Sequence, residues 1–286
     1  MFTTQIPLVH VLLTIISKQA KIIIMGNYFY NFGNWFITKI SRFTSLSAYS
    51  VLILRTILLR KKGKHRTSLS VLFKQVLFTG VFALPVIAMV SLAIGGISII
   101  QSLTYLPKIG GEALIGKLLV TIIVRELSPI LTGFIVIGRS GTAMTAEIGN
   151  MVVSHEIQAL EAMGIDPIQY LVIPRIMGVT ISLISLNIYF NIFSIIGGFL
   201  VSKMVLVTSF SIFIQKIIES MVLADITVNI VKGFTFGILI SLICTFEGFS
   251  VKLSSTEVPK VTTKAVVNAI TAVFLADGII TVIYYI

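Results

Sequence analysis

The sequence has little charge, a single cysteine and no acidic residue before Glu112. Only 12% of its 286 residues are charged and 56% are hydrophobic, whereas a soluble domain carries about 25% charged residues. Its uncharged apolar runs exceed about 18 residues, which is typical of membrane spans and excludes a small soluble core. The lone Cys244 lies in such a run, which excludes an internal disulfide or a cysteine-rich metal site. We interpret it as a packing residue.

The lack of acidic residues leaves the N-terminal part strongly basic. The net charge is +11, and residues 1–75 hold eleven of the 22 Lys and Arg residues. Basic residues beside a membrane span favour cytoplasmic retention and contact with anionic lipid headgroups over binding to nucleic acid. We therefore expect a cytoplasmic N-terminus and no nucleic-acid partner.

Long apolar runs predict an all-α integral membrane protein with five transmembrane helices. The first run has 26 residues without charge, enough to cross about 30 Å of hydrocarbon. In it, Pro85 predicts a kink and Gly95-Gly96 a close helix contact. With the N-terminus inside, five crossings place the C-terminus outside. The predicted spans are Val76–Gln101, Leu118–Gly138, Ile176–Ser202, Ile226–Phe246 and Ala265–Ile286.

The region before this transmembrane domain (residues 76–286) divides into two parts. Residues 1–26 form an N-terminal extension of unknown role, without the basic start and cleavage site of a signal peptide. Residues 27–60 carry aromatic residues followed by spaced basic residues, and their apolar residues recur at roughly helical spacing. Residues 27–75 are therefore predicted to form an interfacial amphipathic helix followed by a basic cytoplasmic loop. Packing of that helix on another part of the protein is the alternative.

The second span contains Arg125, Glu126 and Pro129. A charge at the bilayer centre costs at least ~2.5 kcal/mol, so these charges need partners. Adjacent residues on a helix point in different directions, and we expect Arg125 and Glu126 to have different partners. Pro129 favours a break in the helix. The group is either a polar element that lines a cavity or gate, or a structural anchor near the interface.

Other spans add polar candidates. Asn187 and Asn191 are four residues apart in the third span, so they share a face and are expected to bond a neighbouring helix or line the cavity. Asp277 lies inside the fifth span. Lys232 lies in the fourth span and is expected to extend its amine toward the interface. The Gly233–Gly237 spacing predicts a helix contact.

Between the second and third spans, the sequence predicts a short cytoplasmic helix over residues 155–163. A bend at residues 138–141 leaves the membrane, Ser154 is the expected N-cap, and Gly164 suits the C-terminal cap. Asp166-Pro167 then starts the next helix. A short helix with clear signals at both ends suits docking in a groove of a partner protein. A helix lying flat on the membrane is the alternative, which the acidic Glu156 and Glu161 disfavour.

The chain has one misleading nucleotide-binding pattern. Residues 111–117 read GxxxxGK, but Leu118 replaces the Ser or Thr that would hold magnesium, and the flanking segment is a membrane span rather than a strand. We expect no cofactor, no metal and no catalytic residue, hence no enzyme activity. If ATP drives this protein, the ATPase is another chain.

The stretch from Arg125 to Arg175 is similar to the MlaE family of ABC-type permeases. It contains RELSPIL, GRSGTAMTAEIGNM, HEIQALEAMGIDP and YLVIPR. The family's corresponding patterns read RELGPVL, then GR-G-A and AELG-M, EQIDALE-MG-DP and YLV-PR. The resemblance covers roughly residues 27–286, and makes residues 76–286 an MlaE-type permease domain. One departure is the family's EQIDA, which reads His155-Glu-Ile-Gln-Ala159 and implies an altered ATPase groove.

The resemblance implies a transmembrane permease subunit of a phospholipid transporter. Two copies would form a homodimer around a lipid cavity, a cytoplasmic ATPase would dock on the short helix, and an MCE-domain protein would sit on the other face. Arg125, Glu126 and Pro129 would belong to the element near the cavity. The ATPase-coupling segment would comprise Glu147, Gly149, Met151, His155, Glu156, Ile157, Ala159, Leu160, Glu161 and Met163.

Two other functions are compatible with the residues. An ion-coupled secondary carrier would use Arg125, Glu126, Lys232 and Asp277 as a charge relay, although the spans show no inverted repeat. A scaffold without transport leaves the costly charges unexplained. The resemblance implies the inner envelope of a plastid, if the chain is plastid-encoded, and otherwise a bacterial inner membrane. The identity of the lipid and the direction of transport stay open.

Overall fold

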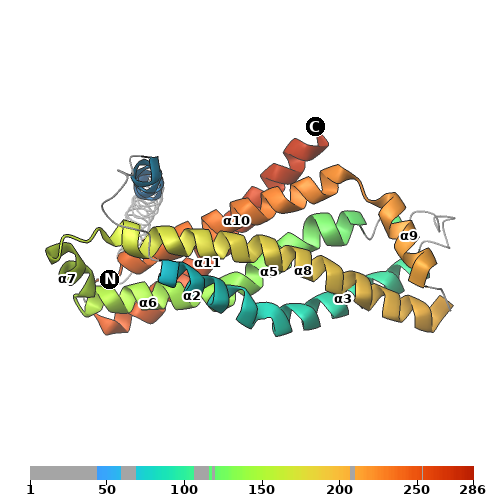
Figure 1. Ribbon diagram of the computed structural model, residues 1–286, viewed down its shortest axis with the longest axis horizontal. Coiled ribbons are helices and arrows are strands. Elements are labelled where there is room, and N and C mark those ends of the chain that lie inside the picture. The colour runs from blue at the N-terminus through green and yellow to red at the C-terminus, as the bar shows by residue number, and fades with distance from the viewer. Residues whose placement is uncertain (1–43, 59–68, 106–115, 118–119, 207–209, 253) are drawn as a thin grey trace, which may run out of the picture. The chain divides into compact units, whose positions relative to one another are not determined.

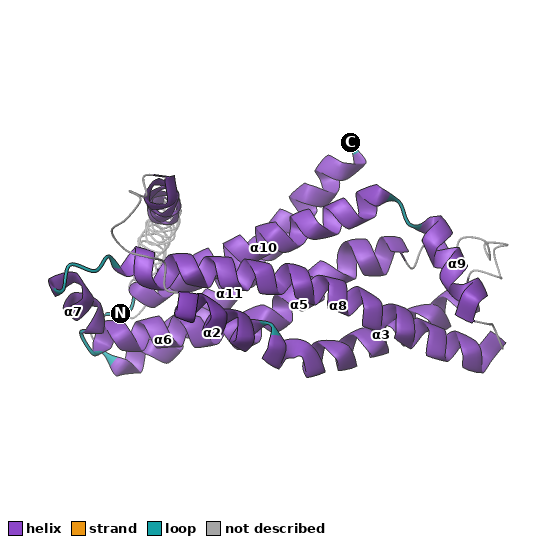
Figure 2. Cartoon of the chain, in the orientation of Figure 1, coloured by secondary structure: helices purple, strands orange, loops and turns teal. Residues whose placement is uncertain are grey.

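The computed structural model describes residues 44–58, 69–105, 116–117, 120–206, 210–252 and 254–286. Within these ranges the chain forms helices and no strand (Figure 2). A short apolar helix covers Thr44–Leu58. The N-terminal extension, residues 27–43 of the predicted interfacial helix and most of the basic loop lie outside the described residues, as does most of the GxxxxGK pattern.

The five predicted spans are confirmed, and each is longer than predicted. They run over Ser70–Thr104, Val120–Val153, Ile168–Met204, Leu223–Phe249 and Ser255–Tyr285. Polar residues extend the ends because they bond within their own helix. Gln75 Nε2 donates to Thr79 Oγ1 at 2.8 Å, and Thr262 Oγ1 donates to the Val258 carbonyl at 2.8 Å.

The first span is interrupted near its start. Helix α2 (Leu69–Thr79) ends before Gly80, a 3-10 turn covers Val81–Ala83, and α3 (Leu84–Tyr105) follows. Pro85 has no N–H to donate into a preceding turn, so the regular helix restarts around it. The predicted kink corresponds to this interruption.

The second span stays helical, contrary to the predicted break at Pro129 and bend at residues 138–141. It passes from a π-helix (η4, Val120–Leu127) to α5 (Ser128–Val136), a second π-helical turn (η5, Ile137–Gly141) and α6 (Thr142–Val153). Pro129 stands in the first turn of α5, after the wider π-helix, where its missing N–H is tolerated.

The remaining elements complete a helical bundle (Figure 1). They are α7 (Glu156–Ala162), η6 (Ile168–Val172), α8 (Ile173–Leu206), α9 (Phe210–Ser220), α10 (Leu223–Phe249), η7 (Ser255–Glu257) and α11 (Val258–Tyr285). The short helices α7 and α9 lie at opposite ends of the bundle, and α3 runs beside α8. The segment between the third and fourth spans contains the helix α9.

Glycines bring three spans into backbone contact. A Cβ built on Gly95 of α3 would overlap the Ser194 backbone of α8, and one built on Gly197 would overlap the Leu92 backbone. On α10, a Cβ at Gly237 would lie 2.5 Å from Thr180 Cα. The close contacts predicted at Gly95-Gly96 and at the Gly233–Gly237 spacing are confirmed.

Candidate functional site

Arg125 lies in a buried pair with Asp225, the residue at the start of α10. Arg125 is 8% exposed, and its Nη2 is ion-paired with Asp225 Oδ1. Nη1 donates to the Tyr285 hydroxyl at 2.8 Å, and the guanidinium lies 4.4 Å from the centroid of the Tyr284 ring. Asp225 Oδ2 also accepts from the Val222 N–H at 3.0 Å, which caps α10. This pair therefore joins η4, α10 and α11.

Lys232 joins two carboxylates from other spans. Its Nζ lies 2.6 Å from Glu126 Oε2 and 2.8 Å from Asp277 Oδ1, and it donates to Thr281 Oγ1 at 2.8 Å. Because the amine has carboxylate partners on neighbouring helices, Lys232 is fully buried. The prediction that its amine extends to the interface is therefore wrong. The prediction that Arg125 and Glu126 have different partners is confirmed.

The two clusters, Arg125–Asp225 and Glu126–Lys232–Asp277, are neighbours because Arg125 and Glu126 are adjacent in η4, and together they are called the ionic network here. It holds two cations and three carboxylates, so it carries one surplus negative charge when all groups are ionised. Lys232 is inaccessible, whereas the Glu126 side chain is 27% exposed. Compensation of this kind is what makes ionisable groups tolerable inside a membrane span. The accessible side of the network is acidic.

The predicted asparagines do not bond a neighbouring helix through their side chains. Within the described residues, the Asn187 amide is buried and has no hydrogen-bond partner, nor has Asn191 Oδ1. Asn187 faces Gly233, where a Cβ would lie 2.8 Å from Nδ2. The main-chain carbonyl of Asn187 accepts a hydrogen bond from Ser128 Oγ at 3.2 Å. Pro129, one residue further along α5, is buried beside this contact.

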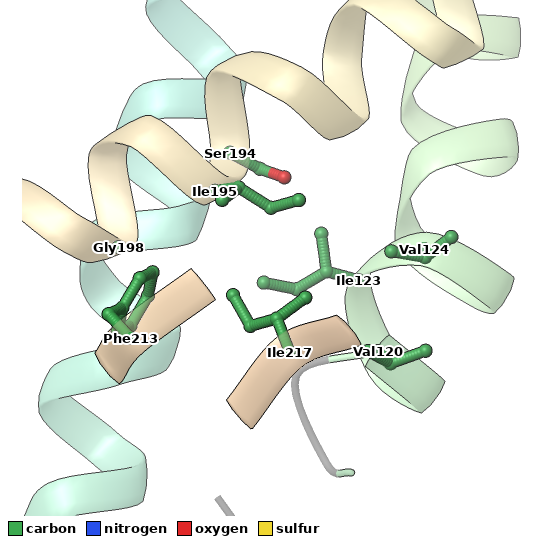
Figure 3. Close-up of a pocket in the computed structure, with 8 residues that line it drawn as sticks. All are labelled: Val120, Ile123, Val124, Ser194, Ile195, Gly198, Phe213 and Ile217. Atoms are coloured by element: carbon green, nitrogen blue, oxygen red, sulfur yellow. The ribbon is translucent and has the colours of Figure 1, made fainter. Parts of the chain in front are cut away.

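A pocket lies beside the network, between η4, α8 and α9 (Figure 3). About 280 Å³ in it is free of protein atoms, part of it open to the outside. Its lining is almost wholly apolar and contains none of the predicted cavity residues. It consists of Val120, Ile123, Val124, Ser194, Ile195, Gly198, Phe213 and Ile217. The network is close in the chain, because Val124 precedes Arg125.

The helix α7 begins one residue later than predicted, with a different cap. The Ser154 N–H bonds the Asn150 carbonyl at 2.8 Å and so completes α6, which rules out Ser154 as the N-cap. His155 takes that position with φ 59°, a left-handed conformation that turns the chain. The predicted C-terminal Gly164 is confirmed with φ 75°. Asp166 Oδ1 accepts from the Ile168 N–H at 2.9 Å, as its predicted capping role requires.

The predicted coupling residues divide into an inner and an outer set. Ile157 is buried, and so is Gly149, where a Cβ would meet Val251 at 3.0 Å. Met151 and Leu160 are half-buried. Glu147 is exposed and pairs with the buried Arg175 of α8 at 2.9 Å. The outer set on and around α7 comprises His155, Glu156, Ala159, Glu161 and Met163.

Several site residues were not selected from the sequence. Asp225 and Glu247 lie one residue outside the two ends of the predicted fourth span, Ile226–Phe246. Glu247 is buried between α10 and α11, where it pairs with Lys264 and accepts from Asn268 Nδ2 at 2.8 Å. The usable indication was electrostatic: each ionisable residue in a span needs a partner of opposite sign in another span.

Known proteins resemble most of this chain. The family model described as Permease MlaE matches residues 72–283. A probable ABC transporter permease of Rickettsia typhi is 33% identical over 74% of this chain and 82% of its own. The intermembrane phospholipid transport system permease protein MlaE of Haemophilus influenzae is 32% identical over 78% and 86%. The chloroplastic protein TRIGALACTOSYLDIACYLGLYCEROL 1 of Arabidopsis thaliana is 30% identical over 72% and 59%.

Proposed function

Because the chain belongs to the MlaE permease family, we propose that it carries phospholipid across a membrane as the permease subunit of an ATP-driven transporter. The observation that supports this most directly is one continuous helical segment. Residues 120–153 run without interruption, contain Arg125 and Glu126 of the ionic network, and end three residues before α7 begins. At 1.5 Å per residue, this segment is about 50 Å long. It connects a polar site inside the membrane to an exposed acidic helix outside it.

In this proposal, α7 is the docking helix of a separate cytoplasmic ATPase. Ile157 anchors α7 on its own protein, while Glu156, Glu161 and Met163 face outward. An exposed methionine beside two exposed glutamates suits a groove that has both an apolar and a basic part. The Glu147–Arg175 pair bridges the helices on either side of α7 and keeps the docking surface in a fixed orientation.

The assembly we propose is a homodimer around a shared lipid cavity. Each copy contributes its network, whose acidic accessible side sits among apolar helix faces suited to acyl chains. An MCE-domain protein binds at the end opposite α7, near α9, and exchanges lipid with the cavity. The resemblance to both a bacterial phospholipid permease and a chloroplastic protein supports a bacterial inner membrane or a plastid inner envelope.

Charge reversal on α7 tests the docking step. Glu156→Lys with Glu161→Lys should abolish co-purification of the ATPase from the native membrane, since both side chains are exposed and the spans are untouched. Glu219→Lys, an exposed change on α9 at the other end, is the matched control. Native mass spectrometry then reports ATPase copies, protomer copies and bound phospholipid. Stoichiometric ATPase on the doubly reversed variant would overturn the docking assignment.

One observation favours a second function, an ion-coupled carrier. Glu126 and Asp277 share the single amine of Lys232, which leaves a surplus carboxylate for a proton or cation. Liposomes containing the purified chain alone distinguish the two functions. A lipid permease without its ATPase should show no transport under a proton or sodium gradient. Uptake driven by such a gradient, together with its loss in the Asp277→Asn variant, would favour the carrier.

A further inference from the structure

Arg139 differs from the buried Arg125, Arg175 and Lys232 because no carboxylate of the described residues pairs with it. It lies on η5, and its guanidinium carbon is 5.3 Å from the Phe78 ring centroid and 5.7 Å from that of Phe82. Among the described residues Arg139 has no ion pair, and its buried Nη1 has no hydrogen-bond partner. The two rings cover the face of the cation and leave this Nη1 group without a partner.

Arg139 lies further along the second span than the ionic network. The residues between Glu126 and Arg139 are uncharged and span about 20 Å along the helix. With Glu126 inside the span, this distance places Arg139 near the edge of a hydrocarbon core about 30 Å thick, where lipid phosphate groups lie. Glu126 has its partner in Lys232. Arg139 needs an anion that the described part of the chain does not supply.

The rings on which Arg139 rests face outward. Phe78 is 36% exposed and Phe82 is 53% exposed, so their outer sides contact whatever surrounds the bundle. Lys74 is also exposed and lies one turn before Phe78 on the same face of α2. The surface patch formed by Lys74, Phe78, Phe82 and Arg139 therefore combines two cations with two apolar rings.

We propose that this patch binds the phosphate group of a membrane phospholipid on the outer surface of the bundle. The planar guanidinium of Arg139 donates to two phosphate oxygens, which is the geometry Arg favours with phosphate. Phe78 and Phe82 contact the adjoining acyl methylenes, and Lys74 adds a second positive charge. The site is separate from the ionic network, and it does not depend on the proposed transport cycle.

A second copy of this chain is a poorer occupant of the patch. The elements α2, η1 and η5 contain no Asp or Glu. A two-fold contact brings the same patch of each copy together. Such a contact would oppose Arg139 and Lys74 to their own counterparts, and like charges in a low-dielectric surrounding repel strongly. A phosphodiester supplies the missing negative charge.

The experiment is native mass spectrometry of the purified chain in detergent, titrated with dioleoyl phosphatidylglycerol. Arg139→Gln should remove one retained lipid per chain and weaken the apparent affinity about tenfold, as loss of a charge-assisted contact predicts. Phe78→Leu with Phe82→Leu keeps apolar, exposed side chains, and should weaken it similarly by removing the rings that hold the guanidinium. Lys203→Gln, an exposed charge removal on α8, should leave binding unchanged.

Four results would overturn the proposal. The first is unchanged lipid retention in both the Arg139→Gln and the phenylalanine variants. The second is equal retention of dioleoylglycerol, which lacks the phosphate. The third is displacement of the lipid by 10 mM inorganic phosphate at the same sites, which would identify a free-anion site instead. Inter-copy crosslinking through Phe82→Cys that replaces the lipid would likewise assign the patch to a second copy.

Discussion

Replacement of Lys232 by methionine should destabilise the protein more than any exposed lysine replacement. Methionine keeps the length and apolar stem of the side chain and removes its charge. The change leaves Glu126 and Asp277 without their shared amine, which lies 2.6 and 2.8 Å from their oxygens. Two carboxylates then face each other in a buried position, where like charges repel and cannot be hydrated.

The expected size of the effect follows from the burial of the amine. Lys232 is inaccessible, and removing one partner of a buried ion pair costs about 3–5 kcal/mol. For a chain of this order of size, each kcal/mol lowers the melting temperature by about 2–4 °C. We therefore expect Lys232→Met to melt about 6–20 °C below the wild type.

Thermal unfolding of the purified protein in one detergent, followed by circular dichroism at 222 nm, measures this difference. The matched control is Lys203→Met, an exposed lysine on α8 whose loss should change the melting temperature little. Combining Lys232→Met with Glu126→Gln and Asp277→Asn should recover much of the loss, because no carboxylate is left unpaired. Equal melting of Lys232→Met and Lys203→Met would refute the assignment of a stabilising ionic network.

Two further changes test packing and pairing by the same assay. Gly95→Ala should lower the free energy of unfolding by about 1–3 kcal/mol by separating α3 from α8. Gly138→Ala is the control and should not lower the free energy of unfolding, because a Cβ there meets nothing within 4 Å. Equal losses of stability in the two variants would contradict the backbone contact. Glu247→Gln should cost about 1–3 kcal/mol by weakening its bond to Lys264. The exposed Glu219→Gln is its control, and indistinguishable melting of the two would remove Glu247 from the structural core.

The number and order of the spans could be predicted from the sequence, because each is an apolar run long enough to cross a bilayer. Their ends could not. Charged and hydroxyl residues such as Lys74 and Thr262 read as loop, yet α2 and α11 continue through them. The Thr262 hydroxyl bonds a carbonyl of its own helix, so it costs the helix little. Hydropathy alone does not register that compensation.

The ionic network could be anticipated only in part. Arg125, Glu126 and Asp277 were selected because charge inside a span is expensive. Their pairing with Asp225 and Lys232 depends on contacts across about 45 to 106 residues of chain, which no local pattern specifies. Local rules failed for a different reason at Ser154, where the backbone bond that completes α6 prevented the expected cap.

The glycine contacts have a mechanical consequence for any conformational cycle. Where the backbones of α3 and α8 touch at Gly95 and Gly197, neither helix can slide past the other without atomic overlap. The contact of Gly237 with Thr180 ties α10 to the same pair. The three spans therefore move together as a single rigid body. Any movement of helices within one chain must then occur at its other helix contacts, along η4, α5 and α11.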